Sequence, residues 1–452
     1  MHTKYIIALL LTLLGFDAQS QRQDLSKRKA FIGVVFSKLP DAGLVIDSVV
    51  SGGSFDAMSV KKGDKLLAVN EKPVKTLPEF GAAVGALRRD DEIHVTVERG
   101  GQKMRFATKG VMRPLETQPF ADIFYDYLPF REGKLRVITK KPVGKTLCPS
   151  ILFIPGYNCS SIENFPNNYN GKIINAWLKA GYAVVCVEKS GNGDSQNCPP
   201  CVEVDFQTDI ETYAKAYEYM RSLPFADTAR LFLWGHSMGG VIAPVIAERY
   251  QPRGVMAFAT VFRPWNEFLL EMHRVQAPLE GKSYVETEAF VRAMHKIYYE
   301  FFILKKSPEA LYAIPEYRDL VVKELDYKPG ATLQWGRHWR FWQQIDELDL
   351  AQSWSNYHGK VLSIFGGADH IQCAEIEQKL IAETVNSKHP GNATYLRIED
   401  IDHLMSINHS WAESNKNLFD NAYHDTHFNT KIAEQTIAWL KQTSDNKTTN
   451  NE

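Results

Sequence analysis

The chain has 452 residues, of which 44% are hydrophobic and 23% charged, values ordinary for a soluble globular protein. Its length suits two or three domains. Because 52 basic and 53 acidic side chains leave a formal net charge of −1, the composition excludes a global field of the kind that attracts nucleic acid or an acidic membrane surface.

Residues 1–20 have the pattern of a cleaved secretory signal peptide. Lys4 supplies a positive charge, Tyr5–Leu14 is a short apolar stretch, and Ala18-Gln19-Ser20 is a small-x-small cleavage site. The alternative is an N-terminal membrane anchor that is never removed. No later segment approaches the ~20 apolar residues of a membrane helix. We therefore expect an exported protein, periplasmic or secreted, with no membrane span.

The first globular segment, about 29–110, is predicted to be β-rich. Apolar or alternating runs favour four strands, and Leu77–Leu87 favours one helix, with Thr76 as its cap and Pro78 in its first turn. The predicted strands are Phe31–Phe36, Gly43–Val50, Lys65–Val69 and Glu92–Glu98.

This segment resembles a bacterial PDZ domain of the kind attached to exported proteases. The resemblance is carried by Phe31-Ile32-Gly33-Val34 and by Gly63-Asp64-Lys65-Leu66-Leu67-Ala68-Val69-Asn70. It implies a groove in which a peptide C-terminus adds as a strand and its carboxylate meets backbone N–H groups of the loop Ala30–Gly33. Phe31, Ile32, Gly33 and Val34 are the candidate groove residues. The alternative is a small β-domain that packs on its neighbour and binds no peptide.

A proline-containing linker is predicted over residues 111–130, and an α/β domain over 131–443. Repeated strand–helix units predict a doubly wound, mostly parallel sheet with helices on both faces. Residues 262–357 lack a clear strand and are rich in aromatics, which favours a helical cap insertion. The polar tail, 444–452, is predicted to be disordered. The predicted strands are Ser150–Pro155, Tyr182–Val187, Leu231–Trp234, Val255–Ala259, Val361–Phe365 and Thr394–Ile398, and the predicted helices are Ile173–Lys179, Asp209–Arg221, Met238–Arg249, Ala374–Thr384 and Thr430–Lys441.

A serine lies between two glycines where a buried strand meets a helix. Gly235-His236-Ser237-Met238-Gly239 has the spacing of a nucleophile elbow, in which glycines allow a turn too tight for side chains. The helix N-terminus behind Ser237 favours developing negative charge. The alternative is a tight turn with an inert serine.

A serine nucleophile needs a base and an orienting acid, and in proteins that carry a nucleophile elbow both follow later in the chain. Asp369 and His403 come directly after two successive buried strands, so they belong to the same sheet edge as Ser237. Asp400 and Glu399 are competitors for the acid. His370 and Asp402 adjoin the proposed partners and cannot easily turn back to them, and His236 is expected to fill space under the elbow.

The oxyanion hole requires two preorganised N–H donors. The backbone of Met238, the residue after the nucleophile, is one candidate. The second belongs to the loop Pro155-Gly156-Tyr157-Asn158, where the Tyr157 N–H is the preferred donor and the Asn158 side chain is an alternative.

Residues 118–443 resemble the α/β-hydrolase superfamily, specifically its exported esterase/lipase-like and serine-aminopeptidase-like members. The resemblance is carried by the Val184–Ser195 stretch VVCVEKSGNGDS and by the elbow. It implies the fold, the catalytic triad and an acyl-enzyme mechanism without a cofactor. The long stretch Leu404–Phe428 departs from the family, and its His424 and His427 are interpreted as surface polar residues with no metal site.

We expect hydrolysis of an acyl ester, with the cap aromatics lining the pocket and Trp335, Arg337 and Trp339 touching the substrate. A serine aminopeptidase fed by the PDZ-like domain is the alternative, and it needs an acidic group for the substrate amine. An adaptor with an inactive hydrolase shell is a third hypothesis. Candidate acids for the amine are Glu267, Glu271, Glu286 and Glu288.

Six cysteines fit an oxidising compartment only loosely. Cys198-Pro199-Pro200-Cys201 has thioredoxin-like spacing but lacks a helix start after a strand. It is interpreted as a short loop disulfide or as two unpaired thiols.

Overall fold

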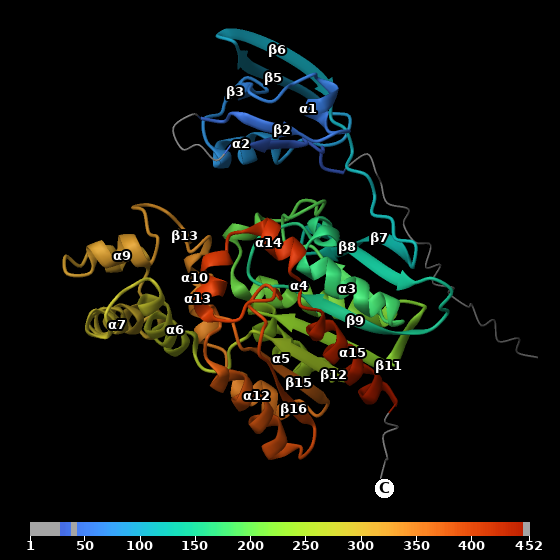
Figure 1. Cartoon of the computed structure of the whole chain (residues 1–452), viewed down its shortest axis with the longest axis vertical. Helices are drawn as coiled ribbons and strands as arrows, with labels where there is room; N and C mark the ends of the chain where they lie inside the picture. The colour runs from blue at the N-terminus through green and yellow to red at the C-terminus, as the bar shows by residue number, and fades with distance from the viewer. Residues whose placement is uncertain (1–27, 38–42, 446–452) are drawn as a thin grey trace, which may run out of the picture.

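The computed structural model describes residues 28–37 and 43–445. A small N-terminal domain stands over a larger α/β body (Figure 1). The predicted signal peptide lies outside the described residues, as does the tail from residue 446. Ser444 and Asp445 complete the last helix instead of belonging to a disordered tail. No helix in the described part of the chain is long and apolar enough to cross a bilayer.

The N-terminal domain is β-rich, as predicted. Its strands form a four-stranded sheet, β4-β3-β5-β6, and a separate antiparallel pair, β1-β2. A capping box starts helix α2, because Thr76 accepts from the backbone N–H of Glu79 while the Glu79 carboxylate accepts from that of Thr76. The elements are β1 (Val34–Phe36), β2 (Ile46–Val49), α1 (Ser54–Ala57), β3 (Lys65–Val69), β4 (Lys72–Pro73), α2 (Leu77–Val84), β5 (Glu92–Arg99) and β6 (Gln102–Lys109).

The body is built on one eight-stranded sheet in the order β16-β15-β12-β11-β9-β10-β8-β7. The six strands from β16 to β10 are parallel, and β8 and β7 run antiparallel at one edge. The predicted doubly wound, mostly parallel sheet is therefore confirmed. The strands are β7 (Ala121–Phe130), β8 (Gly133–Pro142), β9 (Cys148–Ile154), β10 (Ala183–Val187), β11 (Ala226–His236), β12 (Gly254–Phe258), β15 (Lys360–Gly366) and β16 (Ala393–Ile398).

Helices cover both faces of this sheet. One core lies under α3 and α15, where Trp177 and Leu440 are fully buried, and the other lies under α4, α5 and α12. The helices of the body are η2 (Ile162–Asn167), α3 (Tyr169–Lys179), η3 (Cys201–Glu203), α4 (Phe206–Ser222), α5 (Met238–Tyr250), α12 (Glu375–Lys388), α13 (Trp411–Asn417), α14 (Asn421–Thr426) and α15 (Thr430–Asp445).

The linker predicted over 111–130 is too long. Residues 121–130 form β7, the edge strand of the large sheet, so the body begins about ten residues earlier than predicted. Pro129 belongs to this strand although proline removes a ladder donor. It is tolerated because an edge strand pairs on one side only.

The segment between β12 and β15 is a helical insertion with one two-stranded hairpin. It projects from one side of the body (Figure 1). Its elements are α6 (Trp265–Leu279), α7 (Tyr284–Tyr298), the π-helical turn η4 (Tyr299–Ile303), α8 (Pro308–Tyr312), α9 (Arg318–Glu324), β13 (Leu333–Gln334), β14 (Arg337–His338), α10 (Trp339–Asp346) and α11 (Leu350–Asn356).

Candidate active site

Ser237 occupies a strained turn between β11 and α5. Its backbone has φ 54° and ψ −124°, outside the regions that L-residues favour. A Cβ at Gly235 would lie 2.6 Å from the carbonyl oxygen of Gly239, and one at Gly239 would collide with the carbonyl of Ile154. The two glycines are therefore required by close backbone approach, and the turn holds the serine hydroxyl at the sheet edge.

The structure brings Ser237, His403 and Asp369 into one hydrogen-bonded row. His403 Nε2 lies 3.0 Å from Ser237 Oγ, and its Nδ1 lies 2.9 Å from Asp369 Oδ2. The other oxygen of Asp369 accepts the backbone N–H groups of Ile371 and Gln372, each at 2.9 Å. The carboxylate is thus held on both sides, and the imidazole is oriented toward the hydroxyl.

The electrostatics of this row suit a general base. Burial lowers the pKa of His403, but the charge and hydrogen bond of Asp369 outweigh it and leave that pKa above its usual value. Burial raises the pKa of Asp369, and the opposing effects of His403 and the two backbone N–H groups leave it below the usual range. The pair therefore favours a charged carboxylate that stabilises an imidazolium when one forms.

The competing side chains have other partners. Burial, with the nearby charge of His403, lowers the pKa of His236 to about 3, and its Nε2 lies 2.8 Å from the backbone oxygen of His403. His370 Nδ1 contacts the hydroxyl of Ser414 at 2.8 Å. Asp400 lies beside His409, at 3.2 Å. Asp402 accepts three bonds from its own loop.

Two buried cations hold the loop that follows β9. Lys189 Nζ donates to the carbonyl oxygens of Gly156 (2.6 Å) and Asn158 (3.2 Å), and Arg337 donates to that of Tyr157 (2.8 Å). A trans peptide directs its N–H opposite to its carbonyl. The N–H groups of Tyr157 and Asn158 therefore face away from the two cations.

Asp209 provides the counter-charge between these cations. Its carboxylate is fully buried and lies 3.2 Å from Arg337 and 3.7 Å from Lys189. Burial, reinforced by the charge of Arg337, lowers the pKa of Lys189 to about 8 against the opposing effect of Asp209. Sequence reasoning missed Lys189 and Asp209, because no local pattern shows that residues from the segment after β10, from α4 and from the insertion meet.

The loop lies directly beside the nucleophile. A Cβ at Gly156 would be 3.5 Å from Cβ of Ser237 and 3.8 Å from its Oγ. Within the described chain, the Tyr157 N–H has no hydrogen-bond acceptor, and Met238, as the first residue of α5, has none within its helix. Two donors of the predicted type thus flank Ser237.

A small cavity of about 40 Å³ adjoins the hydroxyl. Trp335, Arg337 and Trp339 do not line it, although they were predicted to touch the substrate. Arg337 is buried against the loop that follows β9, and the Trp335 indole donates to the carbonyl of Glu324. The lining residues are Ser237, Met238, Val241, Ala259, Thr260, Val261, Trp265, Phe268, Ile371, Gln372 and His403.

The disulfide differs from both alternatives considered for the Cys198–Cys201 pair. Cys201 bonds to Cys159, in the segment just after the loop, and Cys198 stays free. Pro200 has φ −55° and ψ 137°, an extended conformation. Pro199 precedes a proline, which favours the same extended conformation, and three residue steps of ~3.1 Å would separate the two α-carbons by more than a disulfide spans.

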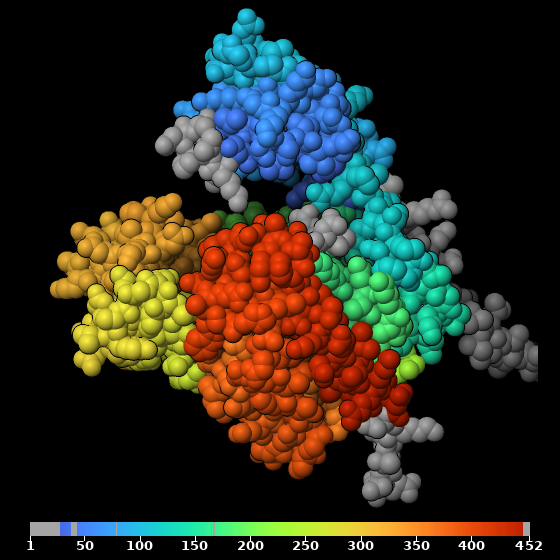
Figure 2. All heavy atoms as spheres, in the orientation of Figure 1, coloured from blue at the N-terminus to red at the C-terminus, as the bar shows by residue number. Residues whose placement is uncertain are grey.

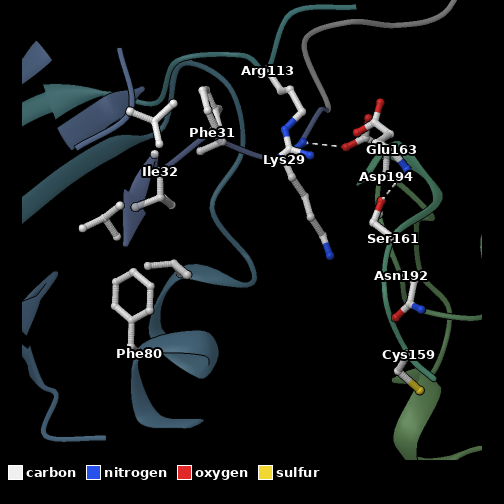
Figure 3. Close-up of a pocket in the computed structure, with 16 residues that line it drawn as sticks. Lys29, Phe31, Ile32, Phe80, Arg113, Cys159, Ser161, Glu163, Asn192 and Asp194 are labelled. Carbon is white, nitrogen blue, oxygen red and sulfur yellow. Dashed lines mark hydrogen bonds between the residues drawn. The ribbon is translucent and has the colours of Figure 1, made fainter. Parts of the chain in front are cut away.

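The four candidate groove residues of the N-terminal domain line a second cavity, of about 510 Å³ (Figure 3). They are Phe31, Ile32, Gly33 and Val34.

Solved structures with a similar fold include Est1E from Butyrivibrio proteoclasticus (12% identity, TM-score 0.44, 71% of this chain and 98% of that chain). Another comes from a structural analysis of two fungal esterases from Rhizomucor miehei (17% identity, TM-score 0.43, 73% of this chain and 85% of that chain). Among curated proteins, esterase EstD of Thermotoga maritima is 24% identical over 179 residues, covering 40% of this chain. The match spans only 36% of the length of EstD.

Two family models match the sequence. The PDZ domain model matches residues 30–109, which confirms the resemblance of the N-terminal domain. The model described as serine aminopeptidase, S33, matches residues 151–397, more than half of the chain. The protein therefore belongs to the serine aminopeptidase S33 family and has a PDZ domain before its α/β body.

Proposed function

We propose that the protein hydrolyses an acyl ester through a Ser237–His403–Asp369 catalytic triad. The observation that carries the proposal is the pair of hydrogen bonds, 3.0 Å and 2.9 Å, that joins the three side chains. His403 takes the proton of Ser237, whose oxygen attacks the acyl carbon. His403 then protonates the leaving alcohol, and water attacks the acyl-enzyme with His403 again as base.

The Met238 and Tyr157 N–H groups hold the oxyanion in both tetrahedral intermediates. Their lack of other acceptors in the described chain, and the cations behind the loop, support this assignment. Donors fixed before the reaction need no reorganisation as charge develops, which is worth about 10²–10³ in rate for a single donor.

The acyl group is short. The cavity beside Ser237 holds about 40 Å³, and Val261, Trp265 and Phe268 enclose it. Because one water-sized group needs roughly 10–15 Å³ of this measure, the space suits an acyl chain of about two to four carbons. The alcohol part of the ester then lies outside this cavity.

The family match favours one further candidate, a serine peptidase that removes N-terminal residues. Such an enzyme needs an acid beside the substrate amine, and none of Glu267, Glu271, Glu286 and Glu288 lines the cavity at Ser237. Glu286 caps helix α7, and Glu288 pairs with Arg274. These contacts favour the ester over the peptide bond.

Substrate panels separate the two candidates. The purified protein is assayed on nitrophenyl acetate, nitrophenyl octanoate and aminoacyl nitroanilides, with Ser237→Ala as the blank. We expect the acetate to be hydrolysed fastest, and Phe268→Ala to shift the preference toward octanoate. Turnover of the nitroanilides with negligible ester turnover would assign the peptidase instead.

The PDZ groove is proposed to capture a peptide C-terminus, and the enzyme to act outside the cytoplasm. The disulfide between Cys159 and Cys201 supports export, because such bonds persist in oxidising compartments. N-terminal sequencing of the protein recovered outside the cytoplasm tests the export, and a start near residue 21 is expected. Recovery only from the cytoplasm with residues 1–20 intact would refute it.

A further inference from the structure

The cavity of about 510 Å³ lies between the two domains and not within either. Figure 2 shows the N-terminal domain set above the body with a hollow between them. One wall comes from the PDZ domain and the linker, and the other from two loops of the body. The body contributes Cys159, Ser161, Glu163, Asn192, Gly193 and Asp194.

Buried ion pairs fix the two walls relative to one another. Arg28, 1% exposed, pairs with Glu163 and, through its Nε at 3.0 Å, with Asp194. The backbone N–H of Lys29 donates to the same Asp194 at 2.7 Å, and Arg136 of β8 binds it at 2.5 Å. Because breaking a buried pair leaves an uncompensated charge, this network resists separation of the domains.

The PDZ wall offers hydrogen-bond donors and an apolar floor. Among the described residues, β1 pairs with β2 only, so its second edge is free to accept a strand. The N–H groups of Ile32 and Gly33 have no acceptor there, and Gly33 has φ 71°. The half-buried side chains of Ile32, Phe80 and Val84 lie beneath them.

Lys29 places a cation in the same cavity. Figure 3 shows its side chain extending into the space between Phe80 and Asn192. Its Nζ has no hydrogen bond or ion pair within the described parts of the chain. Burial and the charge of Arg88 lower the pKa of Lys29 against the opposing charges of Glu188 and Asp194. A partly buried ammonium that makes no direct hydrogen bond is costly, and a carboxylate is the ligand group that would pair with it.

The wall formed by the body is polar. Ser161 is fixed by Glu188 at 2.5 Å, while Asn192 donates to the carbonyl of Ser160 at 3.4 Å and its side-chain oxygen has no donor among the described residues. Figure 3 shows Ser161 and Asn192 opposite the PDZ groove. A segment lying along β1 would therefore meet polar groups on its outer side.

We propose that this cavity is one composite site for the carboxyl-terminal segment of a peptide, which the PDZ domain holds from one side and the hydrolase body from the other. An apolar final residue lies over Ile32, Phe80 and Val84. A peptide carboxylate, either the terminal one or an acidic side chain next to it, pairs with Lys29, and Asn192 contacts the peptide backbone. This inference rests on the proposed capture of peptide C-termini.

Fluorescence anisotropy on the full chain tests it. The probe is a fluorescein-labelled decapeptide of Gly and Ser ending in Asp-Ala-Val, compared with its C-terminal amide and with an Asn-Ala-Val version. We expect the free-acid Asp probe to bind, and Lys29→Met to weaken it about tenfold. If the C-terminal amide binds Lys29→Met as well as the free-acid Asp probe does, Lys29 pairs with the terminal carboxylate. If the Asn-Ala-Val probe binds it as well as the Asp probe does, Lys29 pairs with the acidic side chain. Lys103→Met, on the exposed face of β6, is the matched control.

Asn192→Tyr tests the wall that the body supplies, with Ser387→Tyr on the distant helix α12 as control. Unchanged thermal unfolding shows that both variants fold. We expect Asn192→Tyr to weaken binding of the free-acid Asp probe by at least tenfold. If Asn192→Tyr binds the free-acid Asp probe as tightly as the unaltered chain does, and neither binds the amide probe, the groove is a simple PDZ site and the composite site is wrong. If no probe binds the unaltered chain, the proposed capture of C-termini fails as well.

Discussion

Replacing Arg337 with Met removes one of the two cations that hold the loop 155–158, which we propose supplies an oxyanion donor. The guanidinium is 1% exposed, donates to the Tyr157 carbonyl at 2.8 Å, and packs 3.8 Å from the centre of the Phe341 ring. Its loss leaves Asp209 with Lys189 alone, at 3.7 Å. A hydrogen bond to a charged group contributes about 1.5–3 kcal/mol to stability. Removing one partner of a buried ion pair destabilises the fold by about 3–5 kcal/mol.

We expect Arg337→Met to lower the free energy of unfolding by about 3 kcal/mol, because Lys189 still compensates part of the Asp209 charge. Deleting an oxyanion donor costs about 10²–10³ in rate, and here the donor stays but its support is lost. We therefore expect kcat on nitrophenyl acetate to fall about 10- to 100-fold with little change in KM.

The assay measures kcat and KM beside thermal unfolding. Arg340→Met is the control, because Arg340 is exposed on the same segment and lies over the Trp339 ring. Arg337→Lys should restore little of the lost kcat and stability, since an ammonium cannot reproduce the planar guanidinium that binds both Tyr157 and Asp209. A variant with reduced stability but unchanged kcat would refute the positioning role.

Three further predictions concern the same site and its supports. The pKa of His403 is raised, so activity should fall as the pH drops through a value above about 6.5, and Asp369→Asn should move this limb to lower pH while reducing kcat by ~10³–10⁴ in pH–rate profiles; a limb that does not move would contradict the pairing. Gly239→Ala should prevent stable folding in thermal melts because its Cβ meets the Ile154 carbonyl, whereas Gly81→Ala, in open space, should not; equal melting temperatures would contradict this. Cys159→Ser should lower the free energy of unfolding by about 2–4 kcal/mol in urea titrations, with Cys198→Ser as the nearly neutral control; equal effects would argue against the observed pairing.

The positions of Ser237, Asp369 and His403 at one edge of the sheet were predictable for a physical reason. Each comes after a strand of the parallel part of the sheet, and parallel strands end at the same edge, so strand prediction alone brings the three residues together. The strand before His403, β16, was predicted to be buried but is the edge strand, with only Ile398 buried. The glycines of the elbow were readable because only a tight turn needs them.

Other features were not readable because they depend on contacts between distant segments. Lys189, Asp209 and Arg337 belong to three different segments, and nothing local marks them as partners. Arg337 was predicted to touch substrate because it lies among aromatics, yet a buried carboxylate holds it. Likewise, Pro129 favoured a linker, and only the sheet order shows that it lies in an edge strand.

Labelling with a fluorophosphonate probe tests the central claim most directly, because the probe reacts only with an activated serine beside an oxyanion hole. We predict one stoichiometric adduct, found on Ser237 by mass spectrometry, and labelling that slows by orders of magnitude in His403→Ala. Absence of an adduct would support an adaptor with an inactive hydrolase shell. Ester turnover that persists in Ser237→Ala would contradict the assignment of the nucleophile.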